Sequence, residues 1–96
     1  MATPFPVNAV SNELSNYPKL WRFLEQSLST VPPPLDVLKG LGRAAVPEVV
    51  NFASLTRLLT VFVNTQSALR IAIAEIQGKM PTLAILLTRI LPTLPP

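Results

Sequence analysis

The sequence predicts an all-α protein: a small irregular helical bundle or hairpin around one long central helix, at about residues 47–77. Three observations support this prediction. Apolar residues recur at spacings of three and four, as on one face of a helix. No segment shows the alternation of apolar and polar residues that marks a half-buried strand. Finally, 96 residues suffice for a single domain, so residues 1–96 are taken as one helical domain.

Residues 1–10 are predicted to form an extended N-terminal arm. Pro4 and Pro6 each disfavour helical backbone at the preceding residue. The segment lacks a basic start followed by an apolar run, so it does not resemble a secretory signal, and no localisation is predicted.

Helical spacing resumes in residues 11–29, but Pro18 interrupts it. Proline inside a helix removes a hydrogen bond and clashes with the preceding turn. Two arrangements remain open: one kinked helix, or a short turn followed by a helix that begins at Pro18 and ends at Ser29. We prefer the second, because proline is well tolerated in a first turn.

The middle of the chain is predicted to hold a rigid elbow and a short helix. Three consecutive prolines, residues 32–34, favour a short extended strut between helices. Residues 35–43 should then form a brief helix, with Asp36 near its start and Arg43 near its end, where each charge suits the helix dipole.

Residues 47–77 show the strongest helical pattern in the chain. Pro47 suits a first turn, and no proline or glycine follows until Gly78. A helix of this length is on the order of 45 Å long. Its apolar seam comprises Phe52, Leu55, Leu59, Phe62, Gln66, Leu69, Ile73, Ile76 and Met80. A last apolar helix is predicted at residues 82–91, followed by a proline-rich tail at residues 92–96.

Gln66 is the one polar residue in this seam. Two roles are open for it. A buried amide can pair with its symmetry mate and set the register between helices. Alternatively, the seam is loosely covered there and the amide faces water.

The composition argues against catalysis. The chain has no histidine and no cysteine, which removes the usual general base, thiolate chemistry and most metal sites. No two of its five carboxylates lie three or four residues apart, so no helix carries a paired-carboxylate site. We expect these carboxylates to be solvated surface charges. The predicted protein is non-enzymatic, with no metal, cofactor or small-molecule substrate.

The apolar content points to protein partners. Half of the residues are apolar (49%) and only 14% are charged, against about 25% in a typical soluble protein. The predicted 45 Å stripe is longer than the other helices can cover, which favours a structural subunit that self-associates into a homo-oligomer, coat, filament or larger complex. The predicted interface comprises Trp21, Leu24, Phe52, Leu55, Leu59, Phe62, Gln66, Leu69, Ile73, Ile76, Leu86 and Ile90.

Two alternatives remain open. The first is an adaptor that binds another protein or a lipid surface; a transmembrane span is disfavoured because Arg57 and Arg70 fall in the most apolar window. The second is a coat protein that binds nucleic acid non-specifically. The net charge of the chain is only +3, and the candidate phosphate contacts are Arg57, Arg70 and Arg89.

Overall fold

The computed structural model describes residues 7–31, 33–61 and 65–96, and the all-α prediction is confirmed: these residues contain helices and no strand. The elements, in chain order, are α1 (Val7–Glu13), α2 (Pro18–Ser27), α3 (Leu35–Ala45), the 3-10 turn η1 (Val46–Glu48), α4 (Ala53–Val61), α5 (Gln66–Ile76), α6 (Pro81–Ile90) and the 3-10 turn η2 (Leu91–Thr93).

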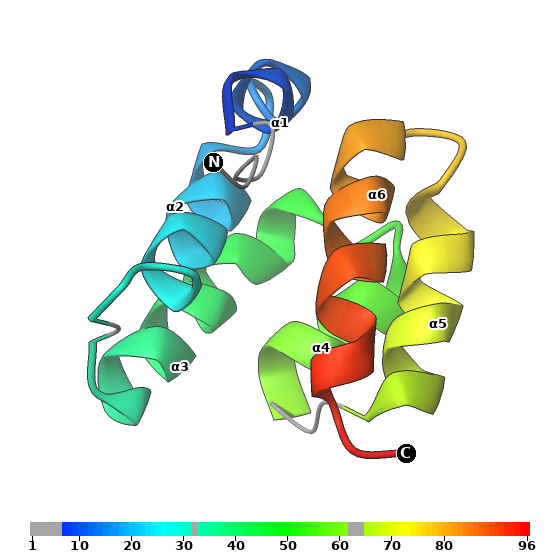
Figure 1. The fold of residues 1–96 in the computed structure, drawn as a ribbon. Helices are drawn as coiled ribbons and strands as arrows, with labels where there is room; N and C mark the ends of the chain where they lie inside the picture. The colour runs from blue at the N-terminus through cyan, green and yellow to red at the C-terminus, as the bar shows by residue number, and fades with distance from the viewer. Residues whose placement is uncertain (1–6, 32, 62–64) are drawn as a thin grey trace, which may run out of the picture.

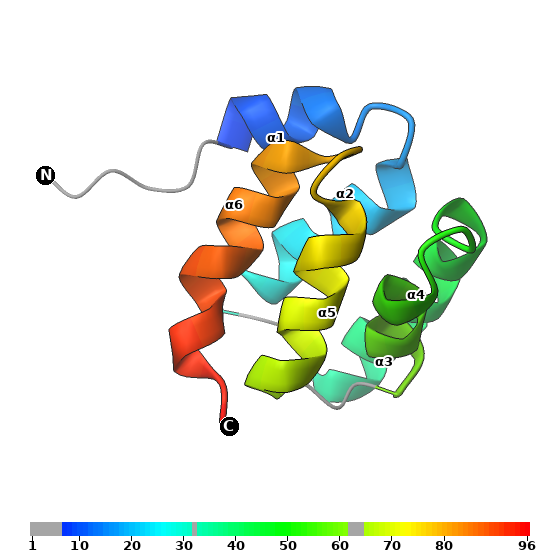
Figure 2. The ribbon, with the colours of Figure 1, turned by 90° about the vertical axis from the view of Figure 1, so that its right-hand side faces the viewer.

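The helices pack in succession around a central space (Figure 1). α2 packs on α3, α3 on α4, α4 on α5 and α5 on α6. α1 lies across the end of the molecule at which α6 begins and packs against that helix (Figure 2). The first and last members of this series, α2 and α6, therefore lie on opposite sides of the centre (Figure 1).

Every long helix contributes to one hydrophobic core. Apolar side chains at helical spacing become fully buried where two helices meet, and each such side chain contributes about 1.5–3 kcal/mol. The largest fully buried side chains are Val10, Leu14, Leu20, Val49, Ile76, Met80, Leu83 and Leu86.

The prediction of one long helix at residues 47–77 is wrong, because η1, α4 and α5 are separate elements. The first break follows η1, where residues 49–52 leave helical geometry before α4 begins. The Phe52 amide donates to the Val49 carbonyl at 2.8 Å, and the Thr56 hydroxyl donates to the same carbonyl at 2.8 Å. One carbonyl oxygen thus closes the turn and joins it to the next helix.

The second break precedes α5. Thr65 has extended backbone (φ −109°, ψ 163°), and its hydroxyl accepts a hydrogen bond from the Ala68 amide, which makes it the N-cap of α5. Residues 62–64, including Phe62, lie outside the described residues. The breaks let the apolar stripe fold back on itself, so that Leu55 on α4 and Leu69 on α5 are buried in the same core.

Outside residues 47–77, the predictions of α2, α3 and α6 are confirmed. The preferred arrangement of residues 11–29 is confirmed in that α1 and α2 are separate and α2 begins at Pro18, although it ends at Ser27. The helices expected at residues 35–43 and 82–91 are also confirmed, with boundaries shifted by one or two residues.

The prediction of an extended arm at residues 1–10 is wrong for residues 7–10. Residues 7–10 are helical in α1, because Val10 and Leu14 bury themselves in the core; residues 1–6 lie outside the described residues. In the predicted elbow, Pro32 likewise lies outside them, and Pro34 is the N-cap residue of α3. The predicted tail begins inside the turn η2.

Candidate functional site

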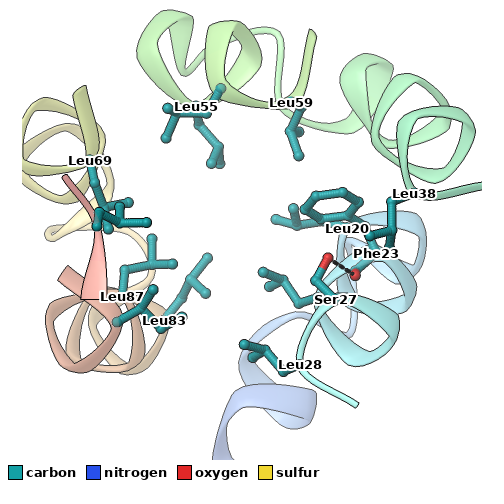
Figure 3. Close-up of a pocket in the computed structure, with 14 residues that line it drawn as sticks. Leu20, Phe23, Ser27, Leu28, Leu38, Leu55, Leu59, Leu69, Leu83 and Leu87 are labelled. Carbon is teal, nitrogen blue, oxygen red and sulfur yellow. Dashed lines mark hydrogen bonds between the residues drawn. The ribbon is translucent and has the colours of Figure 1, made fainter. Parts of the chain in front are cut away.

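An apolar cavity of about 220 Å³ occupies the centre of the bundle (Figure 3). Side chains from α2, α4, α5 and α6 point into it from different sides. We call it the central cavity. Its lining consists of Leu20, Phe23, Leu24, Ser27, Leu28, Leu38, Leu55, Leu58, Leu59, Leu69, Leu83, Leu87, Ile90 and Leu94.

Two helices line the cavity along their length. The α2 residues recur at helical spacing from Leu20 to Leu28, and the α6 residues recur from Leu83 to Ile90. α4 supplies one turn, whereas α3 and α5 supply one residue each. The space persists because α2 packs on α3 and α6 packs on α5, which leaves the facing stripes of α2 and α6 without a helix between them.

The chemistry of the lining is almost uniform. Among the described residues, Ser27 is the only polar one in the lining, and its hydroxyl donates a 2.8 Å hydrogen bond to the Phe23 carbonyl one turn back (Figure 3). The wall therefore interacts with an occupant mainly through dispersion and through removal of apolar surface from water. A dry apolar cavity of about 150 Å³ is already able to bind benzene.

The C-terminal segment closes part of the cavity. The backbone amide of Gln66 donates to the Pro95 carbonyl at 2.9 Å, and its side-chain Nε2 donates to the Leu94 carbonyl at 2.9 Å. Its Oε1 accepts from Arg70 at 3.3 Å. Gln66 thus holds the tail against α5, with Leu94 in the cavity wall. This intramolecular role differs from both of the roles considered for Gln66 above.

The residues predicted to form a partner interface lie largely in the chain's own interior. Those that are buried are Leu24, Phe52, Leu55, Leu59, Leu69, Ile76 and Leu86. Those that are partly buried are Trp21, Gln66, Ile73 and Ile90. Phe62 lies outside the described residues. α4 and α5 are separate helices whose apolar faces share one core, so they do not form the continuous 45 Å stripe on which the prediction of self-association depends.

Three carboxylates have a role that the sequence interpretation missed. Glu13 accepts hydrogen bonds from the first-turn amides of α6, Glu48 from those of α2, and Glu75 from those of α4. The expectation that all carboxylates are solvated surface charges is therefore wrong for these three. Each is negative where the helix dipole is positive.

The sequence does contain a signal for this arrangement. The N-cap positions of α2 and α6 are Tyr17 and Met80, and neither gives a side-chain cap hydrogen bond. Pro18 and Pro81 follow, and proline has no amide of its own. The next two amides of each helix consequently need an acceptor from elsewhere in the chain.

The remaining polar candidates do not form a site. Arg57, Arg70 and Arg89 are exposed on α4, α5 and α6, one on each helix. Within the described residues, no group of three or more acidic, histidine or cysteine side chains could hold a metal ion.

Over the part that the structure describes, no helix is both long enough and apolar enough to cross a bilayer. No protein-family model matches the sequence, and no curated protein or solved structure is significantly similar to it.

Proposed function

We propose that this chain is a non-enzymatic binding protein whose central cavity takes up an apolar group. The observation that carries the proposal is the lining itself: of its fourteen described residues thirteen are apolar, and the hydroxyl of the fourteenth, Ser27, is already bonded. This described part of the wall offers an occupant no nucleophile or acid–base group. It suits retention and release rather than chemical conversion.

The size of the cavity supports an occupant. Protein interiors are packed about as densely as organic crystals and contain few voids larger than a water molecule. An apolar group that occupied the space of about 220 Å³ would gain dispersion contacts with the leucine side chains and would remove apolar surface from water.

Two variants on one helix test the proposal. Leu87 lines the cavity, whereas Ile85, two residues earlier on α6, is 54% exposed. Leu87→Trp places a larger ring in the cavity and should weaken binding of a small apolar probe such as benzene or 1-octanol, measured by calorimetry and by the shift in Tm. Ile85→Trp should bind the probe as the unaltered chain does. Circular dichroism checks that both variants fold.

Either of two results would overturn this proposal. One is the absence of binding by the unaltered chain. The other is equal affinity of the unaltered chain and of a folded Leu87→Trp variant.

A second candidate function, a self-associating structural subunit, is supported by a different observation. Several large apolar side chains are exposed, and four of them fall in the short stretch from the end of α2 to α3. A contiguous exposed apolar patch is typical of a surface that another protein covers, and these four residues are the candidates for such a patch. The exposed side chains are Leu28, Val31, Leu35, Val37, Val50, Ile71 and Ile85.

Light scattering tests this second candidate. A homo-oligomer should have a mass that is a multiple of 10.4 kDa, and Val37→Asp should lower it towards one copy, since an unpaired charge is unfavourable in an apolar contact. The control is Thr60→Asp, at an exposed position on α4, which should leave the mass unchanged. A mass of 10.4 kDa at all concentrations would exclude self-association.

A further inference from the structure

The hydroxyl group in the wall of the central cavity allows the occupant to be described more closely. We propose that the cavity binds a neutral apolar molecule that carries one hydroxyl group, and that this group donates a hydrogen bond to Oγ of Ser27. Alcohols and phenols are such molecules. This inference rests on the proposed function and adds to it the chemical class of the ligand and the residue that selects it.

Ser27 belongs to the face of α2 that lines the cavity. It follows Leu24 by three residues and Leu20 by seven, spacings that place the three side chains on one face of the helix. In Figure 3 its hydroxyl lies beside the Phe23 carbonyl, on the side of α2 that faces the other lining residues. Leu20 and Leu24 are buried, whereas Ser27 is only half-buried, so part of its surface remains accessible to another molecule.

The hydrogen bonding of Ser27 leaves its hydroxyl available as an acceptor. A serine hydroxyl has one hydrogen to donate and two lone pairs that accept. The hydrogen is donated to the Phe23 carbonyl, with 2.8 Å between the two oxygens, because a carbonyl oxygen can only accept. Among the described residues, none donates to the lone pairs of Oγ. An occupant that carries a donor can therefore bind there without breaking the existing bond.

The remainder of the described wall offers a ligand no donor. Its other side chains are apolar. Most of the lining residues lie inside helices, where each amide donates to a carbonyl one turn back or, in the first turns of α2, α4 and α6, to a glutamate. Beyond the end of α2, the Leu28 amide donates to the Leu24 carbonyl at 3.0 Å. Beyond the end of α6, the Leu94 amide donates to the Leu91 carbonyl at 3.1 Å. The oxygen of an ether or a ketone would thus find no partner in this part of the wall.

The same wall disfavours charged ligands. A carboxylate or an ammonium group inside the cavity would lose its hydration, and no charged side chain belongs to the described lining. A neutral hydroxyl group loses less hydration and gains the hydrogen bond to Ser27. The ligand class is accordingly neutral, with its apolar part against the leucine side chains and its hydroxyl group against α2.

Phenol and toluene test this inference, because they are similar in size and differ by a hydroxyl group in place of a methyl group. In Ser27→Ala, bound phenol has no acceptor for its hydroxyl group. Its dissociation constant should rise about three- to tenfold, the factor that corresponds to the net contribution of one hydrogen bond. The dissociation constant of toluene should change little, since toluene makes no hydrogen bond. Calorimetry measures both constants.

The matched control is Ser29→Ala. The Ser29 hydroxyl donates to the Gln26 carbonyl at 2.9 Å near the same end of α2, but Ser29 is not among the described lining residues. This variant should bind phenol and toluene as the unaltered chain does, and circular dichroism checks that both variants fold. Equal weakening of phenol in the two variants would trace the effect to the helix rather than to an acceptor in the cavity, and would overturn the proposal.

Anisole separates donors from acceptors. Its ether oxygen can only accept a hydrogen bond, so Ser27→Ala should not weaken its binding. If the variant weakens anisole as much as phenol, Ser27 acts through the shape of the wall and the proposal fails.

A further measurement needs no variant. Cyclohexane takes up toluene from water in strong preference to phenol, since it offers the phenol hydroxyl no acceptor. The unaltered chain should prefer toluene over phenol by a factor about three- to tenfold smaller than cyclohexane does. An equal preference would mean that no acceptor reaches the ligand, so this inference would fail while the proposed binding function stands. If neither phenol nor toluene binds, both fail.

Discussion

The side chain of Glu13 accepts a 2.9 Å hydrogen bond from the backbone amide of Thr82, which lies 69 residues later in the chain. Its second oxygen accepts from the Leu83 amide at 2.7 Å. Glu48 binds the Lys19 and Leu20 amides at the start of α2 in the same way, at 2.9–3.1 Å. In both cases, a carboxylate from a distant segment caps a helix that begins with proline.

Glu13→Gln should destabilise the fold. The substitution keeps the shape of the side chain but removes the charge and replaces one acceptor oxygen with a donor that faces a backbone amide. We expect the free energy of unfolding to fall by about 1.5–3 kcal/mol, the range for hydrogen bonds to charged groups. Urea denaturation measures the change.

The matched control for this prediction is Glu25→Gln. Glu25 is exposed on α2, and a surface substitution of this kind should change the stability by no more than about 0.5 kcal/mol. Equal midpoints for the two variants would show that the Glu13 cap contributes nothing measurable.

The two glycines of α3 should respond in opposite directions to alanine. A Cβ on Gly42 would lie 2.9 Å from the backbone carbonyl oxygen of Leu59, whereas a Cβ on Gly40 would have no atom within 4 Å. Gly40→Ala should therefore raise the stability by roughly 0.5–1 kcal/mol through higher helix propensity. Gly42→Ala should lower it, because α3 and α4 must move apart. Thermal unfolding of both variants checks the sign, and a stabilised Gly42→Ala would contradict the close approach.

Thr65→Ala should weaken the start of α5. It removes the hydroxyl that accepts the Ala68 amide, and the loss of such a cap costs about 1 kcal/mol. Thr65→Ser retains the hydroxyl and should restore most of the stability. If the alanine variant were instead as stable as the unaltered chain with a higher helix content by circular dichroism, the break between α4 and α5 would not depend on this cap.

Gln66→Ala should loosen the C-terminal segment. It removes the 2.9 Å hydrogen bond from Nε2 to the Leu94 carbonyl while leaving the backbone bond to Pro95 in place. Hydrogen exchange at the Leu94 amide, which bonds to Leu91, should become faster. Gln77→Ala, at an exposed position after α5, serves as the control and should leave this exchange rate unchanged. Equal rates in the two variants would show that Gln66 does not hold the tail.

Local patterns in the sequence determined where three of the helices lie. Spacings of three and four residues predicted α2 and α6 closely, Pro18 marked the start of α2, and α3 was predicted from the preceding prolines and from the charges at its ends. The lack of histidine and cysteine also depends on composition alone and needs no coordinates. These features are local, since each depends on residues within one or two turns of each other.

Only the tertiary structure decided where the heptad stripe of residues 47–77 breaks and what it covers. No proline or glycine marks the breaks inside it; Thr65 turns the chain, and α4 and α5 then bury Leu55 and Leu69 in one core. The same holds for the carboxylate caps, which join segments 20 to 70 residues apart. The central cavity likewise depends on α2 and α6 facing each other without packing together. Such contacts follow from how helices pack around a shared core, and helical spacing alone does not specify that arrangement.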